Sequence, residues 1–117
     1  MTGLANYHNG LAAEDAVELH YKRAGIEIFE ERWRGAGGEI DLIGRDSDGL
    51  VFVEVKRSKT FARAAESLSR RQLSRIMLSA EDYVERMFPG QLVNMRIDLA
   101  MVDTSGQIKV LQNISIL

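Results

Sequence analysis

The sequence predicts a single α/β domain spanning residues 1–117, in which helices pack on a central sheet. Two segments have apolar residues at helical spacing, and five shorter segments are apolar or alternate between apolar and polar residues. Their order is helix, three strands, helix and two strands, which is typical of a mixed α/β sandwich. A chain of 117 residues is long enough for one domain with its own core.

The first half of the chain should form a helix and three strands. We expect the helix at 11–24, opened by Asn9-Gly10 and stopped by Gly25. The first strand is expected at 26–34, where "GAGG" (35–38) ends it as a flexible turn. Two more strands follow within 39–56 and are joined by "RDSDG" (45–49).

The second half should form a long helix and two strands. A polar segment, 57–65, precedes a helix expected at about 67–87, where Pro89-Gly90 ends it. The stretch 92–102 alternates like a strand, Ser105-Gly106 is a turn, and 107–117 is expected to be the last strand.

The composition narrows the class of protein. Apolar residues make up 45% and charged residues 27%, as in folded globular proteins. The absence of cysteine excludes disulfides, thiolate zinc sites and cysteine nucleophiles. No apolar run is as long as a membrane span and no signal-peptide pattern opens the chain, so we expect a cytoplasmic protein without membrane contact. A net charge of −2 argues against a protein that coats nucleic acid.

The predicted hairpin "EIDLIGRDSDGLVFVEVK" (39–56) is unusual because it carries charges among strongly apolar residues. With the turn centred on Ser47-Asp48, the numbers of facing residues sum to 95, so Asp41 faces Glu54 and Glu39 faces Lys56. The period of two places these four charges on one face. The other face is expected to pack in the core through Ile40, Leu42, Val51, Val53 and Val55.

Facing carboxylates repel each other, so this arrangement is costly unless a cation neutralises it. Carboxylate oxygens with open positions for water and phosphate describe a magnesium site. Lys56, on the same face, could orient a metal-bound water or offset charge in a phosphoryl transition state. The structural alternative is a charged surface in which Lys56 bridges Glu39 and Glu54.

A basic strip follows the hairpin. Between Lys56 and Arg75 the chain has seven basic residues and one acid, Glu66. Such a strip can bind phosphate even in an acidic protein, although a solvated helix face is an equally ordinary explanation.

The blocks "GEIDLI" (38–43) and "VFVEVK" (51–56) together resemble the PD-(D/E)xK nuclease superfamily. Over nearly its whole length the chain resembles more closely the YraN-like family, small bacterial proteins that are similar to Holliday junction resolvases. The resemblance implies a restriction-endonuclease-like fold, with a central mixed β-sheet flanked by α-helices. It also implies hydrolysis of phosphodiester bonds in DNA with Mg²⁺ or Mn²⁺, including branched, repair or recombination intermediates.

The resemblance carries roles onto particular residues. Asp41 and Glu54 are similar to the two carboxylate ligands of the metal, and the carbonyl of Val55 would be a further ligand. Glu14 matches an acid on the first helix that completes the acidic site, although by itself it reads as an exposed glutamate. Lys56 is similar to the lysine beside the attacking water.

Other residues belong to the same blocks or to the basic strip. Glu39 shares the expected active face, and Arg34 and the "RID" of 96–98 also resemble the family. Gln72 falls where related nucleases carry a polar helix residue near the site. The residues expected to contact nucleic acid, most readily DNA, are Arg57, Lys59, Arg70, Arg71, Gln72 and Arg75.

Two other functions remain open at this point. The protein could keep the nuclease fold and bind nucleic acid or another protein without cutting. It could also be a structural adaptor whose charged face is a network of ion pairs. The apolar stripe on the long helix permits a homodimer, as in resolvases, but does not require one.

Overall fold

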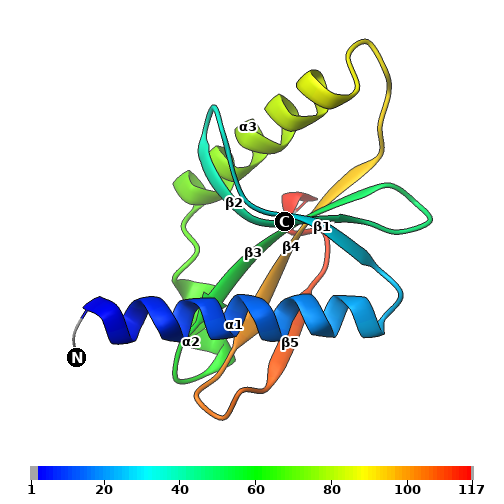
Figure 1. Ribbon diagram of the computed structural model, residues 1–117. Coiled ribbons are helices and arrows are strands. Elements are labelled where there is room, and N and C mark those ends of the chain that lie inside the picture. Colours follow the sequence, from blue (N-terminus) through cyan, green and yellow to red (C-terminus); the bar gives the residue numbers. More distant parts are fainter. Residues whose placement is uncertain (1–2, 117) are drawn as a thin grey trace.

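A computed structural model describes residues 3–116 of the chain, and side chains within 10–115 (Figure 1). Within residues 3–116, no helix is long and apolar enough to cross a bilayer. The predicted central mixed sheet flanked by helices is confirmed. The elements are α1 (Gly3–Arg23), β1 (Glu27–Gly35), β2 (Gly38–Arg45), β3 (Leu50–Arg57), α2 (Phe61–Glu66), α3 (Arg70–Met87), β4 (Met95–Val102), β5 (Ile108–Leu111) and a 3-10 turn (Ile114–Ile116).

The five strands lie in the order β1-β2-β3-β4-β5. The pair β3–β4 is parallel and the other pairs are antiparallel. A parallel pair needs a crossover connection, and α2 and α3 provide it. β3 is therefore the central strand, and its first five residues, including Glu54, are buried. A charged residue in this position has little access to water.

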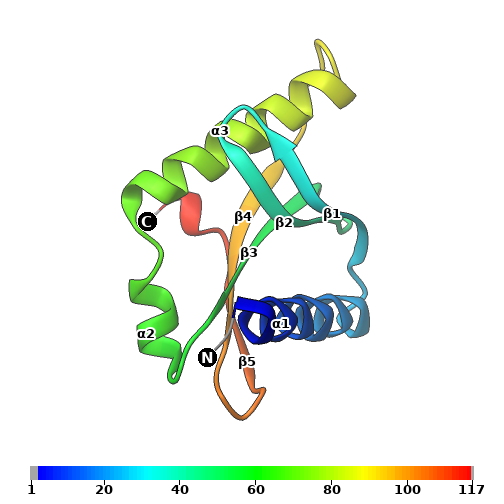
Figure 2. The same ribbon diagram turned by 60° about the vertical axis from the view of Figure 1, so that its left-hand side comes forward.

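Helices cover both faces of the sheet (Figure 2). On one face, α1 packs through Ala13, Val17 and Tyr21, which recur at every fourth residue. On the other face, α2 and α3 cover a second core that contains Phe52 and Ile76. The sheet is thus the middle layer of three, and its interior strands are enclosed on both sides.

Several boundaries differ from those predicted, among them the start of β4 at Met95 instead of 92 and that of α3 at Arg70 instead of about 67. α1 begins at residue 3 and contains Asn9-Gly10, because one glycine inside a helix costs only about 1 kcal/mol and does not end it. The polar segment after β3 forms α2, which Thr60 caps by accepting a hydrogen bond from the Arg63 backbone N–H. β5 ends at Leu111, since Asn113 is left-handed (φ 54°) and its N–H donates to the Asp98 carboxylate. Leu117 lies outside the described residues.

Candidate active site

The β2–β3 hairpin has the predicted register but separates before the charged pairs. Its ladder joins residues 42–45 to 50–53, with partner numbers that sum to 95, and ends at Leu42–Val53. Beyond that point the Asp41 carboxylate takes the place of a backbone partner, accepting a 2.8 Å hydrogen bond from the Val55 N–H. The backbone of β3 therefore holds the Asp41 carboxylate of β2 in place, and β3 also carries Glu54 and Lys56.

This separation corrects one detail of the predicted packing. Ile40 lies in the core beneath α3, with Phe52, whereas Leu42 lies in the core beneath α1, with Val53. The two side chains do not share a face because Asp41, between them, turns toward β3 and interrupts the regular alternation of β2.

Glu54 is the most constrained acid of the site. It is only 6% exposed. Burial, and secondarily the charge of Asp41, raise its pKa to about 8. Burial also raises the pKa of Asp41, while hydrogen bonds from the Val55 N–H and the Glu54 carboxyl lower it. The two acids are thus close enough to share a proton, which is the behaviour of a carboxylate pair lacking sufficient positive charge.

Lys56 supplies part of that charge. Its Nζ lies 3.5 Å from Glu54 Oε1, and its side chain is largely buried. The ammonium also lowers the pKa of Asp41. Lys56 therefore contacts one acid of the pair and acts electrostatically on both.

Glu39 and Lys56 do not pair across the hairpin as predicted. Glu39 instead faces Arg34 on β1, where the two side chains form a 3.8 Å ion pair. The reason is the early end of the β2–β3 ladder, which leaves the start of β2 hydrogen-bonded to β1 alone. Glu39 nevertheless remains near the site, since its charge raises the pKa of Asp41 and Glu14.

Glu14 approaches the site from α1. Burial and then the charge of Asp41 raise its pKa, so the acid predicted on the first helix does lie near the strand acids. Its Oε2 accepts a 2.8 Å hydrogen bond from Arg32, a residue that no sequence motif indicated. Arg32 has a left-handed backbone (φ 47°), which is uncommon for a residue other than glycine.

The residues present suit a hard divalent cation in part. Asp41 and Glu54 offer carboxylate oxygens and excess negative charge, the donor type that Mg²⁺ and Mn²⁺ prefer. However, no three His, Cys, Asp or Glu side chains among the described residues form a group that could hold a metal ion. Glu14 as a ligand, and the Val55 carbonyl, therefore stay predictions, and the two strand acids would be the first to hold the ion.

A cavity of about 220 Å³ opens beside Glu54. Two of the predicted nucleic-acid contacts, Gln72 and Arg75, line it from α3, together with Glu39 from β2. The other predicted contacts are exposed and do not line this cavity: Arg57, Lys59, Arg70 and Arg71.

The sequence patterns indicated a role in the site for neither the glycine turn on the wall of this cavity nor the serine behind it that holds the turn. The sequence predicts a plain flexible turn at "GAGG", but Gly37 and Gly38 line the cavity and Ser79 of α3 hydrogen-bonds to both. A signal for Ser79 was present in the sequence. It lies three residues after Ile76 and four before Tyr83, on the stripe that α3 buries, where a serine needs a polar partner.

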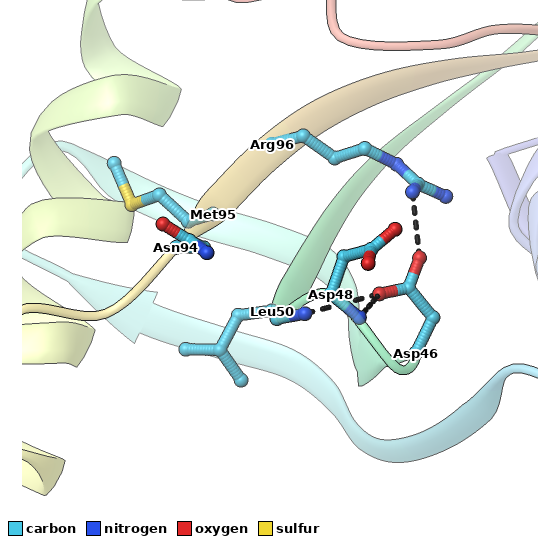
Figure 3. A pocket seen from close by; sticks show the side chains of 7 residues that line it. Asp46, Asp48, Leu50, Asn94, Met95 and Arg96 are labelled. Atoms are coloured by element: carbon cyan, nitrogen blue, oxygen red, sulfur yellow. Dashed lines mark hydrogen bonds and ion pairs between the residues drawn. The ribbon is translucent and has the colours of Figure 1, made fainter.

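A second polar cluster lies at the opposite end of the β2–β3 ladder, beside the turn (Figure 3). There Arg96 donates to Asp46 at 2.7 Å and to the buried Asp98 at 3.1 Å. Asp98 also accepts hydrogen bonds from Tyr21 and the Asn113 N–H. This Arg96 network joins α1, the hairpin turn, β4 and the C-terminal turn.

Comparisons with known proteins identify relatives across nearly the whole chain. A UPF0102 protein of Ruegeria pomeroyi is 47% identical over 111 residues, covering 95% of this chain and 90% of the relative. One of Cereibacter sphaeroides is 45% identical over 113 residues and covers 97% of both chains. Another, of Dinoroseobacter shibae, is 49% identical over 107 residues, covering 92% of this chain and 80% of the relative.

Among solved structures, a repair endonuclease from Pyrococcus abyssi matches with a TM-score of 0.47 and 19% identity. The match covers 81% of this chain and 39% of that one, so this chain spans about two fifths of the endonuclease. The model of uncharacterised protein family UPF0102 matches residues 13–102. The chain therefore belongs to UPF0102, the YraN-like family that its GEIDLI and VFVEVK blocks indicated.

Proposed function

We propose that this protein is a metal-dependent nuclease that hydrolyses phosphodiester bonds in DNA. The observation that carries the proposal is the pair of acids, the partly buried Asp41 and the buried Glu54, brought together beside Lys56. Such a pair destabilises the fold unless a cation binds, and strongly perturbed acids beside a cavity are typical of active sites. The resemblance of the two sequence blocks to PD-(D/E)xK nucleases supports the same chemistry.

The geometry supports the following roles. Asp41 and Glu54 would hold Mg²⁺ or Mn²⁺, with Glu14 and the Val55 carbonyl as further candidates. The ion, when bound, supplies a Lewis acid for a phosphate oxygen and lowers the pKa of a coordinated water. Lys56 would orient the attacking water and offset the negative charge that develops as one P–O bond forms and another breaks.

Nucleic acid would be bound mainly through its backbone. The basic side chains that are exposed after β3 and on α3 can contact phosphates without reading sequence: Arg57, Lys59, Arg70 and Arg71. With so few cations we expect weak, salt-sensitive binding, which a homodimer would strengthen by doubling the contacts.

A cleavage assay tests the proposal. Labelled single-stranded, duplex, flap and four-way-junction DNAs are incubated with Mg²⁺ or Mn²⁺, and EDTA serves as the metal-free control. We expect cutting that is lost in Asp41→Asn and Lys56→Ala and kept in the matched controls Asp48→Asn and Lys109→Ala, whose residues are exposed. Cutting that survives EDTA or both site variants would overturn it.

One observation favours a second candidate, a module that binds nucleic acid without cutting. The site brings two acids and a lysine together, but the described residues form no group of three acids arranged around an ion. If no DNA is cut while wild type and Asp41→Asn bind it equally in EDTA, this function is the correct one.

A further inference from the structure

The turn between β1 and β2 is fastened to α3 by side chains. Ser79 is fully buried, and its Oγ accepts a 2.9 Å hydrogen bond from the Gly37 N–H and donates a 2.8 Å bond to the Gly38 carbonyl. One helical turn further along, Asp82 accepts a 2.8 Å bond from the Ala36 N–H. Three successive residues of the turn are therefore held by one helix, and we call this set of contacts the turn latch.

Glycine is required for the turn to approach so closely. A Cβ on Gly37 would lie 2.0 Å from the Arg75 carbonyl oxygen, and one on Gly35 would lie 3.0 Å from the Ser79 Cβ. The turn backbone thus packs directly on the α3 backbone at Arg75. This contact sets the position of that residue relative to the start of β2.

The latch forms one wall of the cavity beside Glu54. Gly37 and Gly38 line the cavity on the turn side, Arg75 lines it on the helix side, and Glu54 lines it from β3. Its volume of about 220 Å³ is below the roughly 300–1,000 Å³ of pockets for drug-sized ligands. A space of this size suits a phosphate group better than a base pair.

The charges in the cavity favour a phosphate bound together with a metal ion. Glu54 and Glu39 supply negative charge on the strand side, and Arg75 supplies a guanidinium on the helix side. A guanidinium matches phosphate oxygens through paired N–H donors. A phosphodiester lying between the two sides would meet the metal ion on the strand side and the Arg75 guanidinium on the helix side.

We propose that Arg75 binds a phosphate of the nucleic acid in this cavity and that Ser79 is the positioning residue that fixes Arg75 opposite Glu54. The inference rests on the proposed nuclease function and names the part of the substrate that this site takes. Ser79 contacts no substrate and acts through the turn latch.

Ser79→Ala, with Ser74→Ala as the control on the exposed side of the same helix, tests the positioning role. We expect kcat to fall about tenfold or more at nearly unchanged KM, because a small misplacement of a binding group lowers the rate steeply. The sole tryptophan, Trp33, packs edge-on against Tyr83 at 5.1 Å, so its fluorescence reports whether the turn has moved. Assays are run well below each variant's melting temperature.

Two results would overturn the positioning role. One is an unchanged kcat with lowered thermal stability, which would make Ser79 merely structural. The other is a shift in Trp33 fluorescence without loss of rate. If Ser79→Ala does not fold, Asp82→Ala removes the contact with the Ala36 N–H instead, and the same fall in kcat is expected.

Arg75→Ala, with Lys109→Ala as the control, tests phosphate binding. The probe is a short 5′-phosphorylated oligothymidylate, bound in Mg²⁺ by proteins that also carry Lys56→Ala so that none is cut. We expect Arg75→Ala to weaken binding about tenfold and to reduce its salt dependence by about one phosphate contact. Equal binding by Arg75→Ala and Lys109→Ala would overturn the inference.

The two proposals fail in different ways. If the wild-type protein cuts none of the DNA substrates, loss of oligonucleotide binding in Arg75→Ala supports the phosphate site and contradicts the nuclease. Normal cleavage by Arg75→Ala and Ser79→Ala supports the nuclease and contradicts the phosphate site.

Discussion

The two polar clusters of the sheet differ in how their charges are satisfied. In the Arg96 network, Asp98 is fully buried but accepts hydrogen bonds from Arg96, Tyr21 and the Asn113 N–H. At the other cluster, Glu54 is similarly buried, but its nearest charges are those of Asp41, which repels it, and Lys56.

The direction of the pKa shifts follows this difference. Backbone N–H groups of the turn, with Arg96, lower the pKa of Asp46, so the network favours the charged acid. Burial raises the pKa of both Glu54 and Asp41, and the charge of Asp41 raises that of Glu54 further. The Arg96 network therefore stabilises the fold. The Asp41–Glu54 pair is expected to reduce stability while it lacks a bound ligand, which is common for functional sites that break local rules.

The largest expected effect is on the rate of cleavage. Glu54→Gln should lower kcat/KM roughly 10²- to 10⁴-fold, the range for losing a group that stabilises charge or transfers a proton. At pH 8 its melting temperature should be unchanged or higher, because a repelling carboxylate is replaced by a neutral amide. A marked loss of stability would show that the pair is structural, like the Arg96 network.

The Arg96 network should respond in the opposite way. Asp98→Ala leaves Arg96 and the Tyr21 hydroxyl without their buried acceptor, which should cost about 3–5 kcal/mol of unfolding free energy. The melting temperature would fall by roughly 10 °C or more. Thermal unfolding with and without Mg²⁺ measures this fall, and the rise in melting temperature that Mg²⁺ causes should remain in the variant. Stability close to wild type would contradict the contrast.

The stability of the metal-free protein should decline as pH rises from about 4.5 to about 8. The folded state holds a proton on Glu54 up to a pKa of about 8, whereas the unfolded state releases it near the ordinary value of 4.5. The stability that the Glu54 proton contributes is fully present below pH 4.5. It is lost as the pH rises toward about 8, at up to about 1.4 kcal/mol per pH unit.

Denaturant unfolding in EDTA across this window measures the decline. Glu54→Gln should flatten it. The lowered pKa of Asp46 acts in acid, around and below its ordinary 3.8, and so does not interfere. Added Mg²⁺ should restore stability most at the alkaline end. A stability that rises with pH in EDTA would contradict the proposed state of the pair.

The smallest effect concerns the acid on α1. Glu14 accepts a hydrogen bond from Arg32, and among the described residues it does not form a three-ligand metal group with Asp41 and Glu54. Glu14→Gln should therefore weaken Mg²⁺ binding only about tenfold. Titration calorimetry measures this, with Asp15→Asn as the exposed neighbour control. A loss as large as that of Asp41→Asn would make Glu14 a full ligand.

The sequence by itself determined the order of the strands and the two long helices, the register of the hairpin and the family, but not the short helix α2. These features depend on local rules. The period of two places Glu54 and Lys56 on one face of their strand, and the turn sets which residues of the facing strand, such as Asp41, lie opposite them. In the hairpin this reasoning failed where the strands separate, because the Asp41 side chain replaces a backbone partner on β3.

Tertiary structure alone decided the rest. The perturbation of Glu54 arises from burial between two layers of helices, the Glu14–Arg32 pair from α1 crossing the sheet, and the turn latch from Gly37 meeting α3. Each depends on the distance between segments far apart in the chain. Those distances are set by how the layers pack, and no local pattern records them.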